Sequence, residues 1–344
     1  MIRAGTRGDH LHVARIRHAG QMISGPFVQL LVGLALLSLV TGRFLWAETV
    51  VVQNFDYSGR QNTLTFTAVP ARVITTNGAT TELMLRLGLS GHLVGTAYLD
   101  NPVLEDVRTS YDRIPVLSPR YPNKETVLAR EPDLLFGWRS TFGPHALGDV
   151  YYWNKLGVKT FISRNTVLTP QKIAHFYNDL RDIGQIFNIQ DRVESFIAET
   201  EEGIRLIREQ LPPMDERPRV LIAEFASHGR FRAYAEHTLA GEMLTIAGGR
   251  NAFPKEGIYS LEHLIHVDPD VIVFTYMLQD QKSVELQLSE IKEHPILRKM
   301  RVVESNRVYS LPLAEVYSAG VRIPIGIQRL AAYLYPEKFQ CEHP

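Results

Sequence analysis

The sequence has very little cysteine and no surplus of either charge. Its 344 residues include one cysteine, Cys341, which cannot form an internal disulfide, a cysteine zinc cage or an iron–sulfur site. No cysteine lies at the end of the apolar leader, so a lipid-anchored leader is also excluded. Lys and Arg together number 37, as do Asp and Glu, so the sequence lacks the electrostatic signature of a nucleic-acid binder.

The common catalytic motifs are also missing. The sequence contains no G-x-S-x-G nucleophile elbow, no H-E-x-x-H zinc motif and no phosphate-binding G-x-x-x-x-G-K. Gly88, Gly91 and Gly95 do not form the dinucleotide-binding fingerprint. We therefore predict that the chain is not an enzyme and holds no resident cofactor. The alternative is a secreted hydrolase or metal-dependent enzyme whose site follows no familiar motif.

Long apolar stretches are absent except near the N-terminus. Residues 1–25 are polar and rich in arginine, residues 27–40 are almost entirely apolar, and a short tail ends at Ala47. The apolar run is shorter than the ~20 residues that cross a bilayer, and its flanks are those of a signal peptide. We predict a signal peptide over residues 1–47, cleaved after Ala47, and hence a soluble, monomeric periplasmic protein. An uncut membrane anchor is the alternative, and Met22 is an alternative start.

The remaining sequence alternates between short apolar runs and segments with helical spacing. Helical spacing over residues 81–87 ends at Gly88, a residue that favours the left-handed end of a helix. Alternation of this kind is typical of parallel sheets. The predicted strands are residues 72–75, 92–97, 134–137, 158–162, 219–223 and 271–274.

The middle of the chain carries no strand signal. Thr169-Pro170 predicts a helix start, and apolar residues at helical spacing follow on one face. A second helix is predicted over residues 191–210, which would span about 30 Å. The pair Pro212-Pro213 ends it. The apolar face of the first helix comprises Ile173, Phe176, Leu180 and Ile183.

An internal repeat lies on either side of this helical segment. The stretch from Glu125 to Pro132-Asp133 and the stretch from Glu262 to Pro269-Asp270 both fit E-x-x-[LI]-x-x-x-P-D-[LV]-[LI]. A second pair runs from Glu82 to Gly88 and from Glu242 to Gly248. The repeat predicts two similar α/β lobes with mainly parallel sheets, joined by one long helix, with a ligand cleft between them. The predicted bounds are 48–170 for the first lobe, 171–214 for the helical segment and 215–344 for the second lobe.

Several segments in this order resemble one family. They include RVITTNGATTELMLRLG, ETVLAREPDLLFGWRS, AGEMLTIAGGRNAF, YSLEHLIHVDPDVIVF and NRVYSLP, and the similarity runs from about Ala71 to Phe339. Together they resemble the periplasmic binding proteins for iron-siderophores, haem and vitamin B12. The resemblance implies a substrate-binding component that captures a metal chelate and delivers it to the permease dimer of an ABC importer in the inner membrane. A ferric siderophore is the expected ligand, with cobalamin or haem as alternatives.

Glu125 and Glu262 hold matching places in the repeat. Each follows a plausible N-cap residue by two positions and so lies in the first turn of a helix. There an acid complements the helix dipole, which stabilises by about 0.3–1 kcal/mol. The family resemblance implies a second role, in which one glutamate on each lobe docks onto arginines of a permease subunit.

The expected ligand contacts are aromatic and arginine residues in the loops that follow predicted strands. Aromatic rings stack on planar ligands, and arginine offers paired donors to carboxylates. The alternative for each aromatic residue is packing within a lobe, and for each arginine a solvated surface. The candidates are Tyr98, Trp138, Arg139, Phe231, Arg232, Tyr234, Tyr276 and Arg322.

The histidines are the remaining candidates. His263 and His266 share a helix face with Glu262 nearby, but no further ligand cluster is visible, so we predict no protein metal site. His145, His228 and His237 fall in predicted cleft loops, and their roles stay open.

Overall fold

The computed structural model describes residues 49–226, 229–277 and 280–340. The predicted leader, His228 and Cys341 lie outside the described residues. Among the described residues, no helix is long and apolar enough to cross a membrane.

The N-terminal lobe contains a five-stranded parallel sheet in the order β5-β4-β3-β6-β7. Its central strands are buried on both faces, as expected of a parallel sheet covered by helices. Chain order reverses between the two central strands β3 and β6, which makes their carboxyl ends the topological switch point of the sheet. The strands are β3 (Val73–Thr75), β4 (Leu93–Ala97), β5 (Val116–Ser118), β6 (Leu134–Gly137) and β7 (Lys159–Ile162).

The helices of this lobe follow its strands. Helix α2 ends at Gly88, as predicted, because this glycine adopts a left-handed φ of 68°. The helix begins earlier than predicted, because the Asn77 side chain caps it by accepting the N–H of Thr80. The helices are α2 (Gly78–Arg86), α3 (Glu105–Tyr111), α4 (Lys124–Leu128) and α5 (Val150–Lys155).

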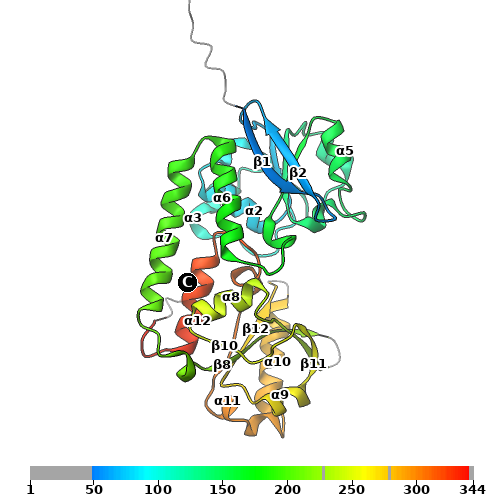
Figure 1. The fold of residues 1–344 in the computed structure, drawn as a ribbon. Helices are drawn as coiled ribbons and strands as arrows, with labels where there is room; N and C mark the ends of the chain where they lie inside the picture. The colour runs from blue at the N-terminus through cyan, green and yellow to red at the C-terminus, as the bar shows by residue number, and fades with distance from the viewer. Residues whose placement is uncertain (1–48, 227–228, 278–279, 341–344) are drawn as a thin grey trace, which may run out of the picture. The chain divides into compact units, whose positions relative to one another are not determined.

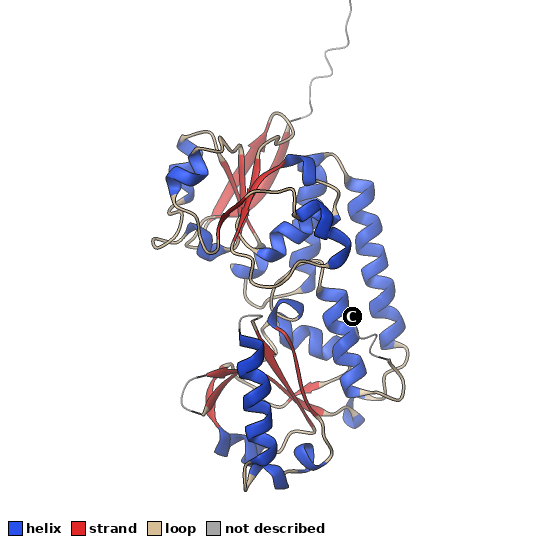
Figure 2. Ribbon diagram, turned by 180° about the vertical axis from the view of Figure 1, so that it is seen from behind, coloured by secondary structure: helices blue, strands red, loops and turns tan. Residues whose placement is uncertain are grey.

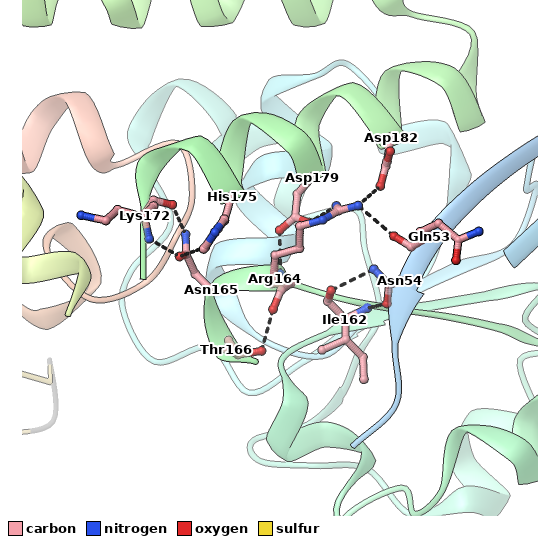
Figure 3. Close-up of polar contacts among 11 residues, drawn as sticks. Gln53, Asn54, Ile162, Arg164, Asn165, Thr166, Lys172, His175, Asp179 and Asp182 are labelled. Carbon is pink, nitrogen blue, oxygen red and sulfur yellow. Dashed lines mark hydrogen bonds and ion pairs between the residues drawn. The ribbon is translucent and has the colours of Figure 1, made fainter. Parts of the chain in front are cut away.

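An antiparallel hairpin, which the sequence did not predict, precedes this sheet. It comprises β1 (Val50–Phe55) and β2 (Gln61–Phe66). The buried Asn54 side chain fastens it to β7, since it accepts the N–H of Ile162 at 2.8 Å and donates to the carbonyl of Ile162 at 3.1 Å (Figure 3). The hairpin loop brings Tyr57 towards the carboxyl ends of the strands.

Two helices form the middle of the chain, α6 (Ile173–Phe187) and α7 (Gln190–Arg208), and they pack side by side (Figure 1). The predicted apolar face of the first helix is buried as expected. The predicted helix start was wrong: Thr169–Pro170 is a cis peptide in the preceding loop, and α6 begins at Ile173.

The C-terminal lobe contains a second sheet in the order β11-β9-β8-β12-β13, with the short β10 beside the start of β8. Strands β8, β12 and β13 are parallel, whereas β9 and β11 run antiparallel to their neighbours. The strands are β8 (Arg219–Ala226), β9 (Arg230–Ala233), β10 (Arg250–Asn251), β11 (Gly257–Ser260), β12 (Val271–Tyr276) and β13 (Val308–Pro312).

Helices cover this second sheet, and Figure 2 shows one sheet in each lobe. The predicted α/β class is therefore confirmed: the first sheet is parallel and the second is mixed. The helices are α8 (Leu239–Ile246), α9 (Leu261–Val267), α10 (Gln281–Glu293), α11 (Arg301–Glu304) and α12 (Ile323–Leu334).

The Pro-Asp repeat has the same structural role in each lobe. Asp133 accepts the N–H of Ala71 at 2.6 Å and that of Arg72 at 3.0 Å, and Asp270 accepts the N–H of Arg219 at 2.7 Å. Each aspartate thereby ties the strand that follows it to the earliest strand of the main sheet of its lobe, β6 to β3 and β12 to β8. The repeated sequence thus corresponds to a repeated strand pairing.

One hydrophobic core joins the lobes. A single cluster of buried side chains includes Leu83 in the first lobe, Leu180 and Ile197 on α6 and α7, and Leu244 and Ile327 on α8 and α12. Separate clusters fill the other face of each sheet. The connection between the lobes is therefore packed along α6, α7 and α12.

Candidate functional site

A cavity of about 300 Å³ lies where strand ends of the first lobe face a loop of the second. Carboxyl ends of strands in open α/β sheets are the usual place for a ligand, and the cavity includes the switch point beside β6. Its lining residues come from the β1–β2 loop, the loops after β6 and β7, the loop just before α6 and the loop after β13. They are Tyr57, Trp138, Arg139, Ser140, Asn165, Thr166, Gln171, Tyr317 and Ala319.

Trp138 and Arg139 form one wall of the cavity, directly after β6. The Arg139 Nε donates to the Tyr57 carbonyl at 2.6 Å, and its guanidinium lies 5.2 Å from the centre of the Tyr57 ring. The Arg139 backbone N–H donates to the Thr166 hydroxyl at 2.9 Å. Among the described residues, no carboxylate pairs with Arg139, so the wall presents positive charge beside two aromatic rings.

Tyr98 stands beside this wall rather than in the lining. Its ring lies 5.2 Å from that of Tyr121 and 5.7 Å from the Arg120 guanidinium. The Tyr121 hydroxyl is 2.7 Å from the Ser140 hydroxyl, which lines the cavity, and burial raises the pKa of Tyr121. Tyr98 therefore contacts the cavity lining only indirectly, because its neighbour Tyr121 contacts Ser140.

The loop after β7 supplies the cavity floor. Arg164 anchors this loop to α6 through ion pairs with Asp179 at 2.6 Å and Asp182 at 2.5 Å (Figure 3). Burial raises the pKa of Asp179 to about 7, although the Arg164 charge opposes the shift. The Asn165 side chain exchanges two hydrogen bonds with the Lys172 backbone, at 2.8 and 2.9 Å. The Lys172 backbone and the Arg164 ion pairs thus hold Asn165 and Thr166 in place in the lining.

Tyr317 forms the opposing wall, from the second lobe. Its ring is 39% exposed and lies 5.8 Å from that of Tyr234, which is buried behind it. The Tyr234 hydroxyl donates to Glu224 at 2.6 Å, and burial together with this carboxylate raises the pKa of Tyr234. Arg232 is exposed on β9 and lies opposite Glu224 in the strand register. Tyr234 therefore supports the wall from behind.

Tyr276 lines a second hollow, of about 330 Å³, at the carboxyl ends of β8 and β12. Glu224 and Thr275 also line this hollow. Because Glu224 accepts the hydrogen bond from Tyr234, the hollow and Tyr234 lie at the same edge of the second sheet. Burial raises the pKa of Tyr276, and the nearby Glu315 adds to the shift.

Five of the eight predicted ligand contacts do not line the cavity or the second hollow: Tyr98, Phe231, Arg232, Tyr234 and Arg322. Phe231 is fully buried and packs against Phe253 and Tyr259, because alternate residues of β9 face the core. Arg322 is bound to Glu82 of the other lobe through two hydrogen bonds, at 2.8 and 2.5 Å. Neither side chain lines the cavity or the second hollow.

Glu125 and Glu262 are exposed in the first turns of α4 and α9. A hydrogen bond from the Ser260 side chain lowers the pKa of Glu262. Three residues after each glutamate, on the same helix face, an aliphatic side chain is also exposed: Leu128 at 37% and Ile265 at 38%. The repeat therefore places an acid and an aliphatic side chain on the surface of each lobe.

The histidines of the described residues do not converge. His145 and His266 are exposed, His237 lies 3.3 Å from Glu256, and the His263 ring lies 3.2 Å from the Ser260 hydroxyl. Within the described part of the chain, no three His, Cys, Asp or Glu side chains form a group that could hold a metal ion.

Sequence reasoning missed part of the lining. Asn165 and Thr166 follow β7 directly, so the rule used for the other strand ends would have found them. Tyr57 precedes the repeated units, and Gln171 and Tyr317 follow no predicted strand, so only the folded chain brings them together.

Known proteins resemble the chain over most of its length. The vitamin B12-binding protein of Photorhabdus laumondii is 26% identical over 276 residues, covering 78% of this chain and 89% of that protein. A solved periplasmic binding protein from Veillonella parvula has a TM-score of 0.75 at 23% identity, covering 84% of this chain and 98% of the other. A structure of an ABC-type Fe3+-hydroxamate transport system from Saccharomonospora viridis has a TM-score of 0.67 at 18% identity, covering 83% and 98%.

The two solved structures share the fold of the chain. The profile of the periplasmic binding protein family matches residues 73–314, a range that begins in β3 and extends past β13. This range holds both sheets, the helical segment and most of the cavity lining. The chain belongs to the periplasmic binding protein family.

Proposed function

We propose that the chain is the extracytoplasmic substrate-binding component of an ABC importer, and that it binds a ferric siderophore or a related metal chelate in the cavity. The observation that carries this proposal is the composition of the facing walls. One lobe presents Trp138, Arg139 and Tyr57, and the other presents Tyr317. Such walls suit a ligand that has planar faces and negative charge.

The cavity lining favours a ligand whose metal is already fully coordinated. Among the described lining residues there is no histidine or cysteine, so a bare metal ion would find few preferred ligands. A ferric siderophore or cobalamin carries its own metal ligands. Haem needs an axial ligand from the protein, for which the tyrosines Tyr57 and Tyr317 are the candidates. Cobalamin is the second candidate, because one relative of the chain is a vitamin B12-binding protein.

Isolation of the protein from the periplasm tests the ligand assignment. We expect a chelate to co-purify at one molecule per chain, identified by its absorption spectrum and mass. N-terminal sequencing of the same preparation tests the leader, for which we expect cleavage after Ala47. The protein should bind its ligand without turnover; hydrolysis of a chromogenic ester or phosphate by the pure protein would instead support the enzyme alternative.

The partner that we propose is the permease dimer of the importer. Two matching surfaces support this, one with Glu125 and Leu128 and the other with Glu262 and Ile265. A monomeric two-lobed protein with equivalent acids on both lobes fits a transporter with twofold symmetry. The aliphatic neighbours would add apolar contact area to each charged contact.

A further inference from the structure

Two glutamates at equivalent positions of the repeat reach across from one lobe to the other. Glu82 precedes Gly88 by six residues, and Glu242 precedes Gly248 by six residues. Both glycines have left-handed backbones, with φ of 68° and 90°, and both end the helix that carries the glutamate. The two glutamates are therefore related by the duplication.

The first interlobe contact joins Glu82 of α2 to Arg322, the residue before α12. The Arg322 Nε donates to one Glu82 oxygen at 2.8 Å and its Nη2 to the other at 2.5 Å. The same Nη2 donates to the Pro102 carbonyl at 2.5 Å, and the Leu104 N–H donates to Glu82 at 2.9 Å. The two side chains are 4% and 12% exposed, so water screens the pair little. The buried Asp100 lies in the same cluster.

The second interlobe contact joins Glu242 of α8 to the start of α6, a helix that Arg164 fastens to the first lobe. One Glu242 oxygen accepts the N–H of Ile173 at 2.5 Å, and the other lies 3.7 Å from Lys172 Nζ. Helix α6 has no side-chain cap from its own Lys172, so a carboxylate of the opposite lobe supplies the cap. Gln171 returns the contact, since its side-chain oxygen accepts the N–H of Leu239, the first residue of α8, at 2.8 Å.

Both contacts adjoin the cavity. Gln171 lines it directly, and Arg322 follows the lining residues Tyr317 and Ala319 by a few positions. A change in either contact would therefore move a cavity wall. The cavity needs both walls at a fixed spacing if one ligand is to touch them together.

We propose that Glu82 and Glu242 are positioning residues that hold the two lobes at a fixed spacing before ligand arrives. Each does so through its own interlobe contact, and the duplication supplies one from each lobe. Both contacts join residues of the chain itself, so their role does not depend on which ligand the protein binds.

The test measures the distance between spin labels on the two lobes of the ligand-free mature protein by pulsed electron resonance. The labels are placed at the exposed positions Lys155→Cys and Lys292→Cys in a Cys341→Ser background. We expect a narrow distance distribution in the parent. Glu82→Ala and Glu242→Ala should each broaden it and extend it to longer distances, and the double variant should broaden it most.

Matched variants separate positioning from general damage. Glu194→Gln breaks an ion pair within the α6–α7 pair, with Arg181, and should leave the distribution narrow. Glu242→Gln keeps an acceptor for the Ile173 N–H, so its distance distribution should stay close to that of the parent, unlike that of Glu242→Ala. The exchange of Glu82→Arg with Arg322→Glu should restore part of it.

An unchanged distribution in the folded double variant would overturn the proposal and would assign the spacing to the shared hydrophobic core. If the double variant does not fold, the two single variants decide in the same way. Failure of the proposed transport function would leave these distances unaffected, because no ligand or permease is present.

Discussion

Trp138 is the residue through which the cavity assignment is most readily tested. It follows β6 at the switch point of the first sheet and lines the cavity beside Arg139. Trp138→Ala should weaken chelate binding by about 1–2 kcal/mol, roughly 5–30-fold, because a stacking face is lost. Calorimetric titration measures the change. Tyr151→Ala, which removes an exposed ring elsewhere in the same lobe, should leave affinity as in the parent. Equal affinity for Trp138→Ala and the parent would place the ligand elsewhere.

At the residue scale, sequence reasoning identified the strand ends but not which side chains face the cavity. Trp138 and Arg139 line it, whereas Phe231 faces the core. Residues of β9 alternate between exposed and buried, so Phe231 faces the core, but β9 was not among the strands predicted from the sequence and this alternation was not used. Arg322 could not be assigned because its partner Glu82 lies 240 residues earlier in the chain.

At the scale of elements, the Pro-Asp unit of the second lobe predicts that the tie between β12 and β8 depends on the charge of Asp270. Burial acts to raise the pKa of Asp270, but hydrogen bonds from the Arg219 N–H and from Arg301 outweigh it and lower the pKa below its ordinary value. A lowered pKa means that the carboxylate stabilises the fold above the pH at which it ionises in the unfolded chain. That contribution is lost as pH falls through the folded-state pKa.

Asp270→Asn should therefore lower the free energy of unfolding at neutral pH by about 1–2 kcal/mol, since charge-assisted hydrogen bonds are weakened. The difference from the parent should shrink as pH falls from about 5 to about 3. Urea unfolding across this range provides the measurement. Asp215→Asn, at an exposed position, serves as the control. A deficit for Asp270→Asn that stays constant with pH would show that the charge of Asp270 is unimportant.

The elements themselves were largely predictable where the repeat extends. Strands β6, β7, β8 and β12 and helices α2, α6 and α7 fall close to the predicted ranges, because apolar runs and helical spacing mark them. The hairpin β1–β2 was missed since it lies outside the duplicated units. Its attachment to β7 includes the buried Asn54 side chain, whose two contacts with Ile162 have no sequence signal.

At the scale of the whole molecule, the proposed docking role of Glu125 and Glu262 would distinguish a transport protein from any other two-lobed α/β protein. Glu125→Arg with Glu262→Arg should weaken binding of the loaded protein to reconstituted permease by about tenfold or more, because like charges would face each other. Uptake in cells should fall, more for both changes than for one, while ligand affinity stays at the parent value. The docking of the parent should weaken with added salt.

The control for docking carries the same change in charge at other exposed positions, Glu199→Arg with Asp215→Arg. It should dock as the parent does. Normal docking by the variant changed at Glu125 and Glu262 would contradict the docking role. The two glutamates would then only complement the dipoles of their helices, and their matching positions would follow from the duplication alone.

The most direct test of the central claim is a calorimetric titration of the mature protein with ferrichrome, ferric enterobactin, cyanocobalamin and haemin. We predict that one of these binds to a single site per chain with a dissociation constant of about 1 µM or lower. That binding should be weakened by Trp138→Ala and unaffected by Tyr151→Ala. Absence of binding by all four, from a folded protein stripped of ligand, would contradict the assignment of the chain as a metal-chelate-binding protein.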